Sequence, residues 1–207
     1  RSWRGFRAGL VRKAYRLGGV DSICNSFLRH PCAICVAMGA SARFGVALCD
    51  NGHKVPGKKG RPMYFDDFTP GFQFETESAS LSESEIIEFA KLYDPQPFHI
   101  DPVAAAASAY GGIIASGFQT MLLAFRLTLQ AGIWNEASMG SPGMREVAWT
   151  KPVRPGDRLF VRAQVTSMRA SKTKPDRGMV EFAYAVINQD GDTVMRYEAT
   201  HMLKRQR

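Results

Sequence analysis

The last third of the chain alternates apolar and polar residues in long stretches, which is the pattern of β-strands with one buried face. The predicted strands span residues 144–153, 158–168, 179–188 and 193–203. Turn-forming sequences separate them, and the last of these, Asp190-Gly191, is typical of a β-hairpin. A shorter alternation over residues 72–79 predicts one further strand.

Helical spacing replaces this alternation in the middle of the chain. A capping box, Ser82-x-x-Glu85, begins a helix that we expect to end near Tyr93. Asp101 is a good N-cap for a second helix, rich in alanine, that runs to Tyr110. Helices are therefore segregated from the later strands, as in α+β proteins.

A third predicted helix differs from the first two in its composition. It follows a second capping box, Ser116-x-x-Gln119, and is apolar nearly all round between residues 118 and 131. A helix that is apolar on every side is normally buried. We therefore predict an α+β fold in which one antiparallel β-sheet wraps around this long buried helix.

The composition is that of an ordinary globular protein, but charge divides the chain in two. Hydrophobic residues make up 45% and charged residues 22% of the 207 residues, which excludes collagen-like and low-complexity classes. No apolar run reaches ~18 residues, so we expect no membrane-spanning helix. Residues 1–62 hold 12 Lys and Arg against 2 Asp and Glu, whereas residues 63–207 hold 15 against 17. We predict a basic, disordered extension over residues 1–62, outside the fold, and one folded domain over residues 63–207.

Several interpretations of residues 1–62 remain open. The segment is rich in Arg and poor in acidic residues, as a transit peptide is, and its arginines could also contact nucleic-acid phosphates. We favour a third interpretation, upstream sequence that was never selected as protein. Cys32-x-x-Cys35 and Cys49-x-x-x-His53 have zinc-like spacing, but no hydrophobic framework surrounds them, so we predict no metal. We expect a cytoplasmic protein, or a mitochondrial one if a transit peptide is present, that binds neither nucleic acid nor membrane.

The clearest candidate chemistry lies between the first two predicted helices. Asp94 and His99 are five residues apart on a stretch that we expect to be non-helical, and Pro95 and Pro97 restrict its backbone. A carboxylate and an imidazole held in one crevice suit general acid–base catalysis. The alternative is structural, with an Asp that makes a turn and a His that caps a neighbouring segment.

Ser116 and Gly117 form a second candidate feature. With Ser116 as N-cap, Gly117 takes the first position of the long helix, where its N–H has no partner within the helix. The helix dipole adds positive potential there, and a residue without Cβ leaves room for a ligand. This N–H could therefore serve as an oxyanion hole. The alternative is plain capping, with glycine present for close packing.

These motifs together resemble a known family, the MaoC-like (R)-specific enoyl-CoA hydratases. The matching sequences are D-x-x-P-x-H-x-D at residues 94–101, Gly117 at the start of an apolar helix, and K-P-V-x-x-G-D at residues 151–157. The resemblance covers residues 64–203. It implies the hot-dog fold, which usually forms a homodimer by joining two sheets and has acyl-thioester sites near the dimer interface.

The resemblance also implies a reaction, the reversible hydration of a 2-enoyl thioester such as enoyl-CoA to the (R)-3-hydroxyacyl thioester, as in fatty acid metabolism. Asp94 and His99 would hold the attacking water, and the N–H of Gly117 would bind the thioester oxygen. Lys151 and Arg154 are candidates to hold the phosphates of coenzyme A. The expected partner is an acyl-CoA or acyl-carrier thioester, and we expect no cofactor besides the coenzyme A of the substrate.

The chain departs from the family pattern at three positions near the predicted site. Tyr93, Gln96 and Ser116 stand where the family commonly has Gly, Asn and His. These differences bear on acyl-chain preference more than on the type of reaction, and we place Gln96 and Ser116 among the substrate-binding residues. Trp134 and Trp149 are expected to pack in the core, with the wall of an acyl tunnel as the alternative.

Two other activities remain open on the same fold. Hot-dog thioesterases commonly use an acidic residue on or near the long helix, and residues 115–135 contain no Asp or Glu. A non-catalytic module that binds acyl thioesters would have no need for an intact acid–base pair.

Overall fold

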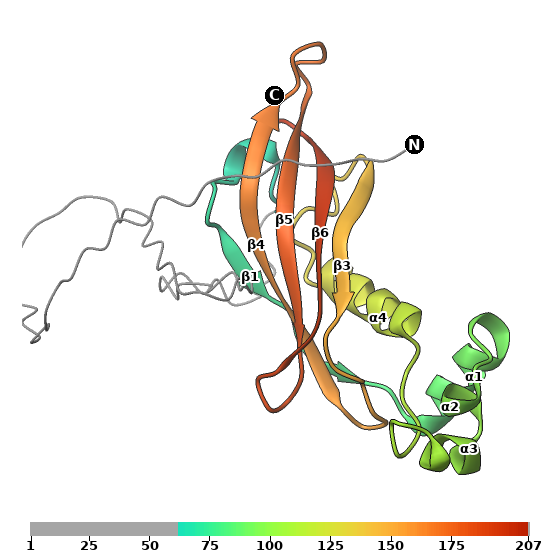
Figure 1. The fold of residues 1–207 in the computed structure, drawn as a ribbon. Coiled ribbons are helices and arrows are strands. Elements are labelled where there is room, and N and C mark those ends of the chain that lie inside the picture. Colours follow the sequence, from blue (N-terminus) through green and yellow to red (C-terminus); the bar gives the residue numbers. More distant parts are fainter. Residues whose placement is uncertain (1–61, 207) are drawn as a thin grey trace, which may run out of the picture. The chain divides into compact units, whose positions relative to one another are not determined.

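The computed structural model of the chain describes residues 62–206 (Figure 1). Within this range, six strands form an antiparallel sheet in the order β1-β4-β5-β6-β3, and β2 pairs with β4 outside this path. The strands are β1 (Gln73–Glu75), β2 (Ala79–Ser80), β3 (Gly143–Trp149), β4 (Arg158–Ala170), β5 (Arg177–Ile187) and β6 (Thr193–Lys204).

The helices occupy the middle of the chain, as the sequence predicts. They are the 3-10 turn η1 (Phe65–Asp67) and the α-helices α1 (Glu83–Tyr93), α2 (Pro97–Ile100), α3 (Pro102–Ala107) and α4 (Gly117–Gln130). Figure 1 shows α4 packed against the sheet, while α1, α2 and α3 gather beyond one end of the strands. The predicted α+β architecture, the hot-dog arrangement of a sheet around one long helix, is confirmed for the described residues.

All four predicted C-terminal strands are present, with ends that differ by a few residues. The burial of β4, β5 and β6 alternates along most of their length, because one face of the sheet packs on the core. The hairpin between β5 and β6 turns at Gly191, whose φ of +81° lies in the region that favours glycine. β3 ends at Trp149, so residues 150–153 form a loop instead of the end of a strand.

The early strand predicted over residues 72–79 is confirmed only in part. Only three of its residues pair with β4 as β1, and the pairing resumes at β2. Between the two, the hydroxyl of Thr76 accepts a hydrogen bond from the N–H of Val161 at 3.0 Å. A side chain thus takes the place of a backbone acceptor, which interrupts the ladder.

The first two predicted helices form with the predicted starts. The capping box of α1 is present, because the N–H of Glu85 donates to Ser82 Oγ at 3.3 Å and the N–H of Ser82 donates to the Glu85 carboxylate at 2.8 Å. Asp101 caps α3, which ends at Ala107 and not at Tyr110. The expectation of a non-helical segment around His99 is wrong, since α2 makes one turn there with Pro97 at its first position.

The predicted burial of α4, which is apolar nearly all round, is confirmed for one side of the helix only. Leu123, Ala124 and Leu127 face the core, but a stripe on the opposite side is exposed. This stripe consists of Phe118 (62% exposed), Leu122 (56%), Phe125 (42%) and Leu129 (38%). Periodicity identified the helix correctly, yet the sheet of one chain covers only one side of it.

The second capping box is not formed either. Ser116 does act as N-cap, because its Oγ accepts from the N–H of Phe118. The amide of Gln119 instead donates to the carbonyl of Glu85 at 3.0 Å, which ties α4 to the first turn of α1. A tertiary contact has therefore replaced the local one.

The core contains a cluster of aromatic rings on the inner face of the sheet. Trp134 is buried there, as expected, with ring centroids 5.5 Å from Phe74 and 4.8 Å from Phe182. Next to it, the hydroxyl of Tyr184 and Nε2 of His201 lie 2.8 Å apart, so the buried imidazole has a hydrogen-bond partner.

The N-terminal predictions fall almost entirely outside this structure. The cysteine motifs, the basic amphipathic segment and the expected disorder of residues 1–62 lie outside the described residues, apart from Pro62. The domain boundary near Met63 therefore stays a prediction. Within residues 62–206, no helix is long and apolar enough to cross a membrane.

Candidate active site

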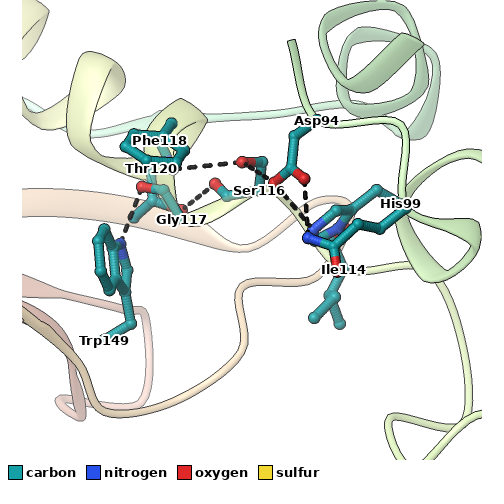
Figure 2. Close-up of polar contacts among 9 residues, drawn as sticks. Asp94, His99, Ile114, Ser116, Gly117, Phe118, Thr120 and Trp149 are labelled. Atoms are coloured by element: carbon teal, nitrogen blue, oxygen red, sulfur yellow. Dashed lines mark hydrogen bonds and ion pairs between the residues drawn. The ribbon is translucent and has the colours of Figure 1, made fainter.

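Asp94 and His99 lie side by side at the end of the sheet where α1, α2 and α4 meet. Asp94 follows the last residue of α1 and His99 lies on α2, and Pro95 and Pro97 restrict the backbone of the short connection between them. His99 Nε2 is 3.3 Å from Asp94 Oδ2 (Figure 2). The His99 side chain is buried, whereas the Asp94 carboxylate is partly open to solvent. The two predicted acid–base residues are thus brought together.

The backbone fixes which nitrogen of His99 carries a proton in the neutral ring. His99 Nδ1 is 2.7 Å from the carbonyl oxygen of Ile114, and a carbonyl can only accept a hydrogen bond. Nδ1 is therefore protonated and donates to Ile114. Nε2, which faces Asp94, is therefore the nitrogen without a proton in the neutral ring.

Two hydrogen-bond donors hold the carboxylate of Asp94. Ser116 Oγ donates to Oδ2 at 2.6 Å, and the amide of Gln96 donates to Oδ1 at 2.7 Å. The hydrogen bond from the Ser116 hydroxyl is the largest of the causes that lower the pKa of Asp94 below its usual value, and partial burial raises this pKa. The Gln96 amide and the charge of His99 lower it further. Asp94 is therefore held in its ionised form.

Gly117 begins α4 next to this pair, and the indole of Trp149 covers it. Trp149 Nε1 donates to the carbonyl oxygen of Gly117 at 2.8 Å (Figure 2). A Cβ on residue 117 would lie 2.7 Å from two indole atoms, so a glycine is required for this close approach. As the first residue of the helix, Gly117 has an N–H with no acceptor within α4.

A pocket of about 530 Å³ connects these groups. Asp94, His99 and Gly117 all line it, together with Gln96 and residues 149–153 at the end of β3 and in the loop after it. Phe98, Tyr110 and Phe118 add aromatic walls to that of Trp149, and the lining is completed by Ile114, Ala115 and Thr120. The predicted core position of Trp149 is wrong: it is the last residue of an edge strand, is 47% exposed and lines this pocket.

The predicted substrate-binding residues are placed differently from one another. Gln96 lines the pocket while its amide holds Asp94, and the buried Ser116 reaches the same carboxylate from behind the lining. Lys151 lines the pocket, and its Nζ is 2.6 Å from a carboxylate oxygen of Asp192. Arg154 lies outside the lining and donates to the carbonyl oxygen of Tyr110, a wall residue, at 2.5 Å. Substrate contact by these four residues stays a prediction.

Sequence reasoning missed the aromatic walls of Phe98, Tyr110 and Phe118, and it considered Trp149 as a wall only as the alternative to a core position. Phe98 sits between Asp94 and His99 in the motif itself, and Trp149 precedes Lys151 by two residues, but neither position has a distinctive spacing. Among residues 62–206, no three His, Cys, Asp or Glu side chains gather as metal ligands would. The zinc-like cysteine motifs are outside that range.

Comparisons with known proteins agree with this geometry. An uncharacterized protein of Bacillus subtilis, YdeM, is 32% identical over 143 residues, which cover 69% of this chain and all of that protein. The crystal structure of a MaoC-like dehydratase from Rhodospirillum rubrum matches with a TM-score of 0.66 and 34% identity, over 70% of this chain and 99% of the other. The unliganded (R)-hydratase PhaJ1 from Pseudomonas aeruginosa matches with a TM-score of 0.58 and 25% identity, over 70% and 88% of the two chains.

The family itself is identified by a match along more than half of the chain. Residues 67–184 match the family described as the MaoC like domain, and this range includes the Asp94–His99 pair, Gly117 and the loop after β3. With this match and the relatives above, the chain belongs to the MaoC-like dehydratase family.

Proposed function

We propose that this protein catalyses the reversible hydration of a 2-enoyl thioester, such as enoyl-CoA, to the (R)-3-hydroxyacyl thioester. The observation that carries the proposal is the pair formed by Asp94 and His99, 3.3 Å apart in a pocket that Gly117 also lines. The similarity to the (R)-hydratase PhaJ1 supports the same reaction class. Fatty acid metabolism is the expected context, and acyl-CoA or an acyl-carrier thioester is the expected substrate.

The acid–base step uses the pair in its ionic form, with Asp94 ionised and His99 protonated on Nε2. A water molecule in the pocket, bound to both groups, gives one proton to Asp94 as its oxygen bonds to Cβ of the enoyl group. Nε2 of His99 gives its proton to Cα, so the net change is the addition of one water molecule. The proton on Asp94 then returns to Nε2 across the 3.3 Å that separates the two groups, which restores the pair.

Negative charge develops on the thioester oxygen as the water adds. The N–H of Gly117 stabilises this oxygen at the N-terminus of α4, where the helix dipole also favours negative charge. Because no electrons are exchanged with a carrier, the proposed reaction requires no redox cofactor. Coenzyme A would take part only as a piece of the substrate, and Lys151, which lines the pocket, would attract its phosphates.

Hydration of crotonyl-CoA, followed by loss of the enoyl-thioester absorbance, tests the proposal directly. Asp94→Asn keeps the shape of the side chain and removes the base, and His99→Ala removes the imidazole. Each should lower kcat by ~10²–10⁴-fold, the usual contribution of general acid–base groups, without a loss of fold by circular dichroism. Near-full hydratase activity in both variants would refute the assignment of the site.

The same preparations distinguish the alternative activities. A thioesterase would release free thiol from saturated acyl-CoA, and a binding module would hold the thioester without turnover. α4 carries neither Asp nor Glu, which argues against a thioesterase that uses an acidic residue on this helix. A panel of longer and branched enoyl groups would then define the acyl preference.

A homodimer is the oligomeric state that we propose for this function. The exposed apolar stripe of α4 (Phe118, Leu122, Phe125 and Leu129) begins beside the end of β3, where the ring centroids of Phe118 and Trp149 are 6.1 Å apart. Among the described strands β3 pairs only with β6, so it is an edge strand. A second copy joined at this edge would cover the stripe, as family resemblance predicts. Sedimentation velocity measures the state directly. The cytoplasmic location, with the mitochondrion as alternative, stays a prediction.

A further inference from the structure

We infer that Ser116 is a positioning residue that holds the carboxylate of Asp94 in one orientation and in its ionised form. The sequence suggests a contact with substrate for this serine, whereas the geometry points to a role that acts through Asp94. The inference rests on the proposed function for its catalytic meaning, but the contact itself can be tested without substrate.

The hydroxyl of Ser116 is committed to Asp94 by its surroundings. Its side chain is fully buried, and its Oγ is 2.6 Å from Asp94 Oδ2, 22 residues away in sequence. The same Oγ accepts a hydrogen bond from the N–H of Phe118 at 3.3 Å. A serine hydroxyl has a single proton, so with its oxygen occupied as an acceptor that proton is left for the carboxylate.

The two donors to Asp94 are not equivalent. Both donate to the same ionised carboxylate, but Gln96 is exposed to water, which competes for its amide, whereas Ser116 is buried. Hydrogen bonds to charged groups are stronger than neutral ones, and a buried environment strengthens them further. Ser116 therefore contributes more than Gln96 to the orientation and charge of Asp94.

Ser116 also sets the relation between the two halves of the site. It is the N-cap of α4, so it places the N–H of the next residue, Gly117, at the helix start. Through Asp94 it binds the C-terminal end of α1. One residue thus couples the proposed base to the proposed oxyanion donor, and a shift of either helix end would move both.

Few other charges act on Asp94 from the surrounding elements. α2 presents His99, and the first turn of α4 has no charged side chain. The loop after β3 brings Lys151 to the same pocket, with its Nζ paired to Asp192. Tyr110 is the remaining titratable group in the pocket lining. Removal of the Ser116 hydroxyl should therefore appear as a clear change in the titration of Asp94.

The decisive experiment titrates Asp94 in the substrate-free protein. The full chain carries ¹³C-labelled aspartate carboxyl groups, and the Asp94→Asn spectrum assigns the resonance. Ser116→Ala and Ser116→Gly both remove the hydroxyl, and the glycine keeps most of the capping preference at this position. We expect the pKa of Asp94 to rise by about one unit in both variants, the size of a lost hydrogen bond to a carboxylate.

A matched control separates this effect from a general loss of buried hydroxyls. Thr128→Val removes a buried hydroxyl from the same helix, where it bonds to the carbonyl oxygen of Ala124 at 2.9 Å. This variant should leave the titration of Asp94 unchanged. An unchanged pKa of Asp94 in both Ser116 variants would overturn the inference and leave Ser116 as a helix cap only.

The pH dependence of kcat/KM tests the same role of Ser116 independently. The acidic limb of the kcat/KM profile should move up by about one pH unit in the Ser116 variants, and kcat should fall more than KM rises. A structural role alone would lower the thermal midpoint without moving the limb. If the wild-type protein hydrates no enoyl thioester, the proposed function fails, whereas the titration still decides whether Ser116 holds Asp94.

Discussion

Replacement of Gly117 by alanine tests the proposed oxyanion hole at a single atom. A Cβ at this position would lie 2.7 Å from Cε2 and Nε1 of Trp149, well inside van der Waals contact, so the indole must move. Trp149 is nearly half exposed and ends an edge strand, so it has room to rotate. The rotation breaks its hydrogen bond to the Gly117 carbonyl and its edge contact with Phe118, whose ring centroid is 6.1 Å away.

The expected effect on stability is small because two contributions oppose each other. Loss of one hydrogen bond costs about 1 kcal/mol, and displacement of a half-exposed ring adds a similar amount at most. Alanine in place of glycine in a helix returns about 0.5–1 kcal/mol. We expect the free energy of unfolding to fall by about 1.5 kcal/mol at most.

The expected effect on turnover is much larger if the N–H of Gly117 binds the thioester oxygen. A methyl group and a displaced indole both intrude on the place that this oxygen must take. Loss of one oxyanion donor costs ~3 kcal/mol, which corresponds to about 100-fold in kcat/KM. The fall in activity should therefore exceed the fraction of protein that is unfolded by a wide margin.

A double-mutant cycle with Trp149→Ala separates the two effects. Thermal midpoint and kcat/KM of crotonyl-CoA hydration are measured on the same preparations of both single variants and the double variant. Without the indole, Gly117→Ala should no longer lower the midpoint, but it should still lower kcat/KM. A folded and fully active Gly117→Ala enzyme would refute the oxyanion hole. Disappearance of the activity loss in the Trp149→Ala background would show that the methyl group acts only through the indole.

Two further outcomes follow from the structure. Burial lowers the pKa of His201 to about 4, so between pH 4 and 6.5 only the unfolded chain binds a proton at this residue. The free energy of unfolding should therefore be highest above pH 6.5 and fall by up to about 3 kcal/mol as the pH drops to 4. Urea unfolding at several pH values should show a weaker pH dependence of this free energy in His201→Gln than in the wild type. The N–H of Met63 donates to the carbonyl of Ile133 at 2.8 Å. A chain that begins at Met63 should keep the melting temperature and activity of the full chain. A large loss of melting temperature would contradict the predicted boundary.

Local sequence patterns were sufficient for most elements of this fold. The alternation in β4, β5 and β6 and the capping box of α1 depend on residues close in sequence, and both predictions are confirmed. The candidate pair Asp94 and His99 was also accessible, because the prolines between them restrict the backbone of a short segment.

Predictions failed where a residue's environment depends on distant parts of the chain. The hydrophobicity of α4 predicts burial, but one sheet covers only one side of a helix, and Leu122 shows the other side exposed. Ser116 and Trp149 have no sequence signal for their contacts, since Asp94 lies 22 residues from the first and Gly117 lies 32 residues from the second.

The sequence by itself therefore determined the fold class and the chemical groups of the site, because periodicity, caps and prolines act locally. The tertiary structure decided how those groups are connected: which donor holds Asp94, which ring covers Gly117, and which side of α4 faces solvent. These features arise where segments far apart in sequence pack together. No local sequence pattern specifies the side-chain geometry at such contacts.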